Sequence, residues 1–302
     1  MDGNKIATVG MFDGVHRGHR ALLERLHSEA RQRGASTAVF TFDRHPLALI
    51  APERVPATLM SLSDKIKALK ESGADQIEVL HFDNDLRSLT ARQFLKMLHD
   101  DYGVTALLMG FNHRFGSDRL DDLSEYERIG GELGIDIIRA DELRDESLTE
   151  RTICSSSIRE AIAEGDVAAA AHMLGRPFAI QGKVIHGRQL GRTIGFPTAN
   201  IEPSDGGLMT PLKGVYAVNV SLPDGERRRG MVNIGVRPTV DCSAQPETSV
   251  EVYIADWEGD LYGKEIRLEF IKRLRDERRF PDIDSLRRQL TFDLEETKKL
   301  QP

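Results

Sequence analysis

The sequence predicts two domains of different classes: an α/β domain with a parallel sheet, then an antiparallel all-β domain that ends in a helix. At 302 residues the chain is about twice as long as a typical domain of roughly 150 residues. Up to about residue 140, short apolar runs alternate with amphipathic stretches, as in a parallel sheet covered by helices. Near residue 176, strand-like runs separated by Gly and Pro turns replace this alternation. We therefore expect domains at 1–175 and 176–302.

Composition narrows the class of protein. Hydrophobic residues make up 40% of the chain and charged residues 29%, which is ordinary for a globular protein. The net charge of −7 disfavours nucleic acid as the principal partner. The chain shows neither a secretory signal nor an apolar run long enough to span a membrane, and its two cysteines have no metal or disulfide spacing. We expect a cytoplasmic protein without a membrane partner.

In the α/β domain, chemistry is expected in the loops that follow the strands. Parallel sheets bind their ligands beyond the carboxyl ends of the strands. The first apolar run, at 6–12, leads into a glycine-containing turn, and the run ALLMGF at 106–111 leads into another. These two loops are the first places to look for binding residues.

In the second domain, period-two alternation indicates strands. Ile266, Leu268 and Phe270 alternate with Arg267 and Glu269, so one face of this strand points inward. Several similar runs lie between residue 176 and this strand. The pattern predicts an antiparallel barrel or sandwich, followed by a helix from about residue 282 to 299.

A pair of histidines marks the first loop. Gly14 and Gly18 permit close backbone approach at the start of a helix, whose free N–H groups favour phosphate by roughly 0.3–1 kcal/mol. His16 and His19 are three residues apart, so they share a side of the helix start and are placed to donate hydrogen bonds to phosphate oxygens. A single histidine is more often a surface or core residue, but two in this frame favour a phosphate site.

The run FDGVHRGH at 12–19 resembles the H-x-G-H signature of adenylyl- and cytidylyltransferases, and over its full length it resembles the bacterial FAD synthetases. The resemblance implies a Rossmann-like nucleotidyltransferase domain in which both histidines stabilise charge at the α-phosphorus of ATP. The run GFNHRFG at 110–116 agrees with it. There the resemblance implies flavin contacts for Asn112 and Phe115, although Asn112 alone is equally typical of a turn.

The segment CSSSIR at 154–159 precedes a predicted short helix, in which Ser157 and Glu160 have the spacing of a capping box. The segment is also similar to the family motif S-S-T-x-I-R. That similarity implies that Ser155 and Arg159 hold triphosphate oxygens, a role that suits the bidentate, permanently charged guanidinium.

The second domain opens with a glycine-rich loop that leads into a strand. Its three glycines and two arginines suit a backbone cradle for phosphates, although such loops alone are weak evidence. Pro197 leads into Thr198 and Asn200, whose side chains share one side of an extended strand. Oxygen donors of this kind suit Mg²⁺, which keeps water and substrate phosphates as its other ligands. A polar strand face beside a turn is the plainer alternative.

The pattern GRxxGFPTAN at 191–200 resembles the riboflavin kinase signature, which implies a Greek-key barrel. In this family Glu251 matches the base that accepts the proton of the riboflavin 5′-hydroxyl. Asp256 and Glu258 are nearby rivals, and an exposed charge on an edge strand is the structural alternative for Glu251. The piece RDERRF at 275–280 is implied to lie near the flavin, so Arg275 is a candidate flavin contact. The resemblance further assigns ATP phosphates to Gly187, Gly191, Arg192 and Gly195, and the metal to Thr198 and Asn200.

Together these motifs identify the chain as resembling the bifunctional riboflavin kinase/FAD synthetase family. The resemblance implies phosphorylation of riboflavin to FMN and adenylylation of FMN to FAD, with ATP as co-substrate and Mg²⁺ as cofactor. Two alternatives stay open. One activity is lost, more readily the transferase, because Cys154 replaces the first serine of its motif. Alternatively, the protein is a flavin-binding sensor without catalysis.

Overall fold

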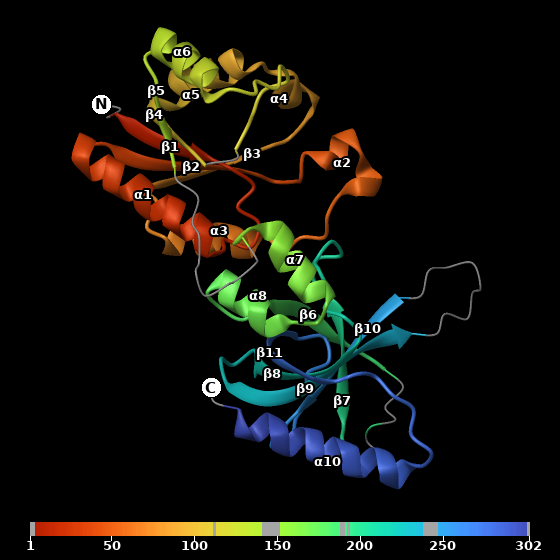
Figure 1. Cartoon of the computed structure of the whole chain (residues 1–302). Coiled ribbons are helices and arrows are strands. Elements are labelled where there is room, and N and C mark those ends of the chain that lie inside the picture. The colour runs from red at the N-terminus through yellow and green to blue at the C-terminus, as the bar shows by residue number, and fades with distance from the viewer. Residues whose placement is uncertain are drawn as a thin grey trace. The chain divides into compact units, whose positions relative to one another are not determined.

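The computed structural model describes residues 4–110, 113–140, 152–187, 191, 194–237 and 247–300. Its contacts divide the chain into two compact units, Met1–Pro56 with Ser61–Cys154 and Ala57–Met60 with Ser155–Pro302. Figure 1 shows the parallel sheet in the first unit and the barrel in the second. None of the helices in the described ranges is long and apolar enough to cross a membrane.

The first unit is a five-stranded parallel sheet in the order β3-β2-β1-β4-β5, as the alternating pattern predicts. The strands are β1 (Lys5–Val9), β2 (Ser36–Phe42), β3 (Gln76–Leu80), β4 (Val104–Met109) and β5 (Asp136–Arg139). The chain reverses its direction of strand addition between β1 and β4, so ligands are expected beyond the carboxyl ends of these two strands.

Helices cover both faces of this sheet. In Figure 1, α1 (Arg17–Arg33) and α3 (Leu62–Glu71) lie on one face, and α5 (Ala91–Tyr102) and α6 (Leu123–Leu133) lie on the other. The core runs through β1, β2 and β4 to apolar residues of α5 and α6. Short helices α2 (Leu47–Ile50), η1 (Pro52–Arg54) and α4 (Asn84–Ser88) lie in the connections. Burial on both faces explains the near-continuous apolar runs of the central strands.

The second unit is a closed antiparallel barrel in the order β10-β7-β6-β11-β8-β9. Its strands are β6 (Ala179–Ile185), β7 (Thr198–Pro203), β8 (Gly214–Ser221), β9 (Arg227–Arg237), β10 (Glu247–Ile254) and β11 (Glu265–Arg275). The last strand returns to lie beside β8, which gives the Greek-key order that the family resemblance implies. The helix α10 (Ile283–Lys299) follows, capped by Asp282, whose side chain accepts from the amide of Ser285 at 2.6 Å.

Two further helices, α7 (Ser155–Ala163) and α8 (Val167–Leu174), belong to the barrel unit. The amide of Leu212 donates to the carbonyl of Ile162 at 3.2 Å, and α8 packs against β11. Because α7 begins at Ser155, Ser157 lies inside the helix, and the predicted capping box of Ser157 and Glu160 is wrong. The compact units divide after Cys154, and the functional boundary near residue 176 stays a prediction.

Candidate active sites

The turn between β1 and α1 has an unusual backbone. Phe12 and Val15 have positive φ angles of 49° and 37°, and Gly14 has a φ of 85°. The amide of Val15 donates to the carbonyl of Phe12 at 3.0 Å, and both side chains are buried. Positive φ at a bulky or β-branched residue costs on the order of 1–3 kcal/mol and is found mainly where function requires it. The turn is therefore held in a strained shape by its buried side chains.

This turn brings His16 and His19 together, as their spacing predicts. His16 caps α1, and its Nδ1 accepts a hydrogen bond from the amide of His19 at 3.2 Å. The two rings stack with centroids 3.6 Å apart and planes 17° apart. Because Nδ1 of His16 is an acceptor here, the proton of its neutral ring lies on Nε2. The predicted role of this histidine in donating to phosphate therefore falls to Nε2.

The surroundings of His19 favour the uncharged form of its ring. Burial, then the neighbouring His16 and Lys65, hold its pKa well below the usual value. Its Nδ1 is buried and has no hydrogen-bond partner among the described residues. A buried imidazole nitrogen without a partner is a group that a bound ligand can satisfy.

Backbone conformation and close contacts explain why two positions of the turn are glycines. Gly14 lies in the left-handed region, where a side chain is strained. A Cβ at Gly18 would lie 3.1 Å from the His16 ring and 3.2 Å from the carbonyl oxygen of Ile153. Both positions therefore support the shape that holds the two histidines.

A lysine that the motifs did not single out lies at the same edge of the sheet. Lys65 of α3 is 6% exposed, and its Nζ donates to the carbonyl of Phe42 at 2.8 Å and to that of Met11 at 3.2 Å. The available signal is its spacing of four residues from Leu69, the other buried residue of α3. A charged residue in that position reads as exposed from sequence alone.

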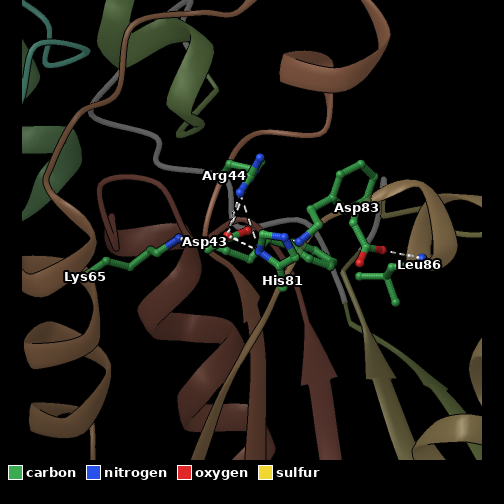
Figure 2. A network of polar contacts seen from close by, with 8 residues as sticks. Asp43, Arg44, Lys65, His81, Asp83 and Leu86 are labelled. Atoms are coloured by element: carbon green, nitrogen blue, oxygen red, sulfur yellow. Dashed lines mark hydrogen bonds and ion pairs between the residues drawn. The ribbon is translucent and has the colours of Figure 1, made fainter.

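Asp43 joins the ends of β2 and β3. Its carboxylate accepts from the amide of Phe82 at 3.0 Å and from Nδ1 of His81 at 2.7 Å, and Arg44 lies 3.4 Å away (Figure 2). Burial opposes ionisation, but the bonds from Phe82 and His81 outweigh it and lower the pKa of Asp43. The edge of the sheet thus carries a fixed carboxylate beside the Lys65 ammonium.

The loop after β4 places Phe115 in an aromatic group. Its ring centroid lies 4.8 Å from that of Tyr126 and 5.1 Å from that of Phe94. The Tyr126 hydroxyl donates to the Phe115 carbonyl at 2.7 Å. Nε2 of His113 is buried without a partner among the described residues, and burial lowers its pKa to about 4. The flavin role of Phe115 stays a prediction, and Asn112 lies outside the described residues.

Ser155 and Arg159 lie at the start of α7 in the second compact unit. Nε of Arg159 donates to the carbonyl of Ala57 at 2.7 Å, so part of its guanidinium is engaged within the protein. The role of both residues in holding triphosphate oxygens stays a prediction.

In the barrel, the predicted kinase residues form one row across paired strands. Glu251 of β10 is directly opposite Asn200 of β7 on one side and Asn233 of β9 on the other. Directly paired residues project to the same face, with Cβ atoms about 4.5–5.5 Å apart. Asn233 was not among the site residues predicted from the sequence. Its amide nitrogen donates to Glu277 at 3.3 Å.

Two described glycines of the glycine-rich loop, Gly187 and Gly191, have no room for a side chain. A Cβ at Gly187 would lie 2.0 Å from the amide nitrogen of Asn200, and one at Gly191 would lie 2.1 Å from the carbonyl oxygen of Phe196. Gly195 has a positive φ of 82°. Steric fit thus requires glycine at the first two positions and backbone conformation favours it at the third, whereas Arg192 lies outside the described residues.

A cavity of about 380 Å³ opens beside the start of β7. Thr198 and Pro197 line it together with Trp257 and Tyr262, and the ring of His186 stacks on Tyr262 at 3.8 Å. Asn200 and Glu251 project to the face opposite Ala199 and Val252, which also line the cavity. Thr198 is the predicted metal residue that borders it.

The oxygen donors of this half fit Mg²⁺. The Asn200 amide and the Glu251 carboxylate are cross-strand neighbours, and Thr198 is two residues away on β7. Within the described ranges, no group of three or more His, Cys, Asp or Glu side chains is placed to hold a metal. Mg²⁺ is usually held by a small number of protein oxygens together with substrate phosphates.

Arg275 forms a buried ion pair. Its Nε lies 2.8 Å from the carboxylate of Asp293, whose side chain is 3% exposed, and Gln289 donates to the same carboxylate at 2.6 Å. The guanidinium carbon lies 5.7 Å from the centre of the Phe280 ring. Arg275 therefore ties β11 to α10, and its contact with flavin stays a prediction.

Comparisons with known families and proteins support the resemblance found in each half of the chain. A family model described as FAD synthetase matches residues 1–157, and one described as riboflavin kinase matches residues 174–301. The bifunctional riboflavin kinase/FMN adenylyltransferase of Escherichia coli K12 is 41% identical over 95% of this chain and 90% of that protein. The chain belongs to the bifunctional riboflavin kinase/FMN adenylyltransferase family.

Other members of this family give the same coverage. The Haemophilus influenzae protein of this name is 37% identical over 96% of this chain and 92% of its own length, and the Bacillus subtilis protein is 34% identical over 96% and 90%. A crystal structure described as a macrolide-efflux protein from Streptococcus pneumoniae shares 31% identity, covers 100% of this chain and 96% of its own, and has a TM-score of 0.88. That likeness extends the shared fold over both units of this chain.

Proposed function

We propose that residues 176–302 phosphorylate riboflavin to FMN and that residues 1–175 adenylylate FMN to FAD, each with ATP. The observation that carries the proposal is that each half has its own polar site, stacked histidines at the end of β1 in one and the Asn200-Glu251-Asn233 row in the other. The two reactions therefore have separate residues. A cytoplasmic location stays a prediction.

In the kinase reaction, the riboflavin 5′-hydroxyl oxygen forms a bond to the γ-phosphorus of ATP while the bond to the ADP oxygen breaks. Glu251 accepts the hydroxyl proton. Thr198 and Asn200 are the proposed metal residues, and Mg²⁺ supplies positive charge to the phosphates when bound. The glycines of the loop hold the backbone close to the phosphates.

In the transferase reaction, a phosphate oxygen of FMN attacks the α-phosphorus of ATP, and pyrophosphate leaves with the bridging oxygen. His16, through Nε2, and His19 donate hydrogen bonds to the phosphate oxygens as negative charge shifts to the leaving group. No side chain forms a covalent intermediate. The strained turn fixes the two rings before ATP arrives, so the site is preorganised.

The test incubates the full chain with ATP, Mg²⁺ and either riboflavin or FMN, and separates the flavins by chromatography. His19→Ala is expected to abolish FAD formation and to leave FMN formation intact. Glu251→Ala is expected to lower FMN formation by 10²–10⁴-fold, on the order seen for loss of a general base, and to leave FAD formation from supplied FMN intact.

Two matched controls complete the experiment. His27→Ala removes a histidine of the same helix that bonds to the carbonyl of Ser72 at 2.9 Å, and Glu269→Gln neutralises a carboxylate of β11. Both should keep both activities. Loss of both activities in His19→Ala or Glu251→Ala would contradict separate sites, and flavin binding without product would favour a sensor.

A further inference from the structure

Lys65 occupies a position that is costly for an ammonium group. It is 6% exposed, and its Nζ donates to two backbone carbonyls, that of Met11 at 3.2 Å and that of Phe42 at 2.8 Å. Phe42 ends β2, and Met11 lies two residues beyond β1. An ion is buried in this way only where its surroundings compensate it. Lys65 thus fastens the carboxyl ends of two neighbouring strands at the edge where ligands bind.

The charged groups around Lys65 come from three elements. Asp13 of the turn and Asp43 at the end of β2 favour its charged form, whereas burial, the larger effect, lowers its pKa. Figure 2 shows its side chain extending from α3 toward Asp43. The charge of Lys65 in turn lowers the pKa of His19 of α1. The lysine therefore interacts electrostatically with two carboxylates and an imidazole.

The charge of Lys65 acts on the protonation of His19. A cation near a buried imidazole disfavours a second positive charge, and burial and His16 act in the same direction. A bound triphosphate has the opposite effect, because its negative charge favours the imidazolium. The charge of Lys65 counteracts this effect of the triphosphate, in the same direction as burial and His16.

We propose that Lys65 is a positioning residue of the adenylyltransferase site, which fixes the turn after β1 and keeps His19 uncharged when ATP binds. The proposal rests on the proposed role of His19 in that reaction. Lys65 acts through the Met11 carbonyl on the turn and through its charge on the ring, without touching substrate. A lysine that only links two strand ends would also fix the turn, but its charge would have no effect on His19.

The test compares three variants of the full chain. Lys65→Met keeps the length of the side chain and removes the charge, Lys65→Arg keeps the charge, and Lys67→Met alters an exposed lysine of the same helix. The pKa of His19 is measured by NMR with labelled histidine, assigned with His19→Ala. FAD formation from FMN is followed from pH 5.5 to 8.5. Circular dichroism reports the folding of the first unit, and riboflavin kinase activity reports that of the barrel unit.

The expected results separate electrostatics from scaffolding. In Lys65→Met, the pKa of His19 should rise, the acidic limb of the FAD-formation profile should move to higher pH with it, and kcat/KM for ATP should fall more at pH 5.5 than at pH 8.5. Lys65→Arg should restore the wild-type profile at least in part, and Lys67→Met should match wild type throughout. FMN formation should be unchanged in all three.

Several outcomes would overturn the proposal. A His19 that titrates near pH 6.5 in the wild-type protein contradicts it even if Lys65→Met does not fold. An unchanged His19 pKa in a folded Lys65→Met variant, or a shifted pKa with unchanged FAD formation, also contradicts it. The proposed function fails on a different observation, full FAD formation by His19→Ala, so the two failures are distinguishable.

Discussion

The two sites of this chain are built in different ways. In the barrel, Asn200, Glu251 and Asn233 are aligned by strand register, so hydrogen-bonded backbone holds each side chain in place. In the parallel sheet, His16 and His19 lie beyond the end of a strand, in a turn with positive φ at Phe12 and Val15. The barrel site is rigid because its strands are paired. The transferase site depends on a strained turn that other residues must hold.

This difference has a consequence for substitutions. Residues that support the transferase site do so through buried groups such as Lys65, whose removal changes both charge and turn geometry. Residues that support the proposed kinase site do so through close packing. A position in a paired strand fixes the direction of its side chain and leaves little room around that side chain. Charge changes should therefore affect FAD formation most, and small steric changes should affect FMN formation most.

The largest loss of stability is expected at a buried ion pair of the barrel, which is an exception to the reliance of this unit on close packing. Asp293→Ala leaves Arg275, whose side chain is 16% exposed, without its carboxylate, and loss of one partner of a buried pair costs about 3–5 kcal/mol. We expect the unfolding free energy of the barrel unit to fall by that amount. Trp257, the single tryptophan of the chain, reports this transition by fluorescence in urea.

The control for this measurement is Asp284→Ala, an exposed aspartate on the same helix whose side chain is 76% exposed. It should change stability by less than about 0.5 kcal/mol. If Asp293→Ala instead leaves stability unchanged and weakens riboflavin binding, Arg275 serves the flavin as its motif implies, and its role in joining β11 to α10 is minor.

The next effect tests packing in the kinase site. Gly187→Ala places a Cβ 2.0 Å from the amide nitrogen of Asn200, so the loop or the asparagine must move. A displacement of about 1 Å in a catalytic group lowers the rate by up to about 10²-fold, and we expect a loss of that order in kcat for FMN formation. FAD formation from FMN should not change, as measured by chromatography.

Gly206→Ala is the matched control, because a Cβ there meets nothing within 4 Å. It should leave both activities as in the wild type. If Gly187→Ala retains full kinase activity, the contact between the loop and Asn200 does not set the geometry of the site, and the contrast between a packed and a charged site loses its main support.

The same contrast explains what could be predicted from sequence. Local patterns predict the strands, the helices and the strand ends that carry His16 and His19, because these depend on residues close in the chain. The pairing of Glu251 with Asn200 is not local, since β7 and β10 are about 50 residues apart in the chain, and the register of β9 with β10 sets the place of Asn233. Motif resemblance supplied Glu251, and only the structure adds Asn233.

Buried charged residues are the other feature that could not be predicted from the sequence. Lys65 and Asp293 look like exposed residues of amphipathic helices, because their compensating partners are the carbonyls of Met11 and Phe42 in one case and Arg275 in the other. No spacing rule connects residues so far apart. The capping box at Ser157 failed for a smaller reason, because α7 begins at Ser155, three residues before the helix start that the motif suggests.

The smallest expected effect concerns the stability of the first unit in acid. Burial lowers the pKa of His113 from 6.5 to about 4, so between these values the unfolded chain binds a proton that the folded chain does not. Stability is therefore fully present above pH 6.5 and decreases as the pH falls toward 4. From pH 6.5 to 5 this group alone should remove about 2 kcal/mol.

His113→Phe removes the titrating group and should flatten that part of the pH dependence. Urea unfolding followed by circular dichroism at several pH values measures it, and the Trp257 fluorescence transition identifies the barrel unit as an internal reference. The buried imidazole of His19 has the same sign, so its contribution should persist in the variant. An equally steep loss in wild type and variant would mean that His113 is solvated in the folded protein, and the loss would then be assigned to other groups such as His19.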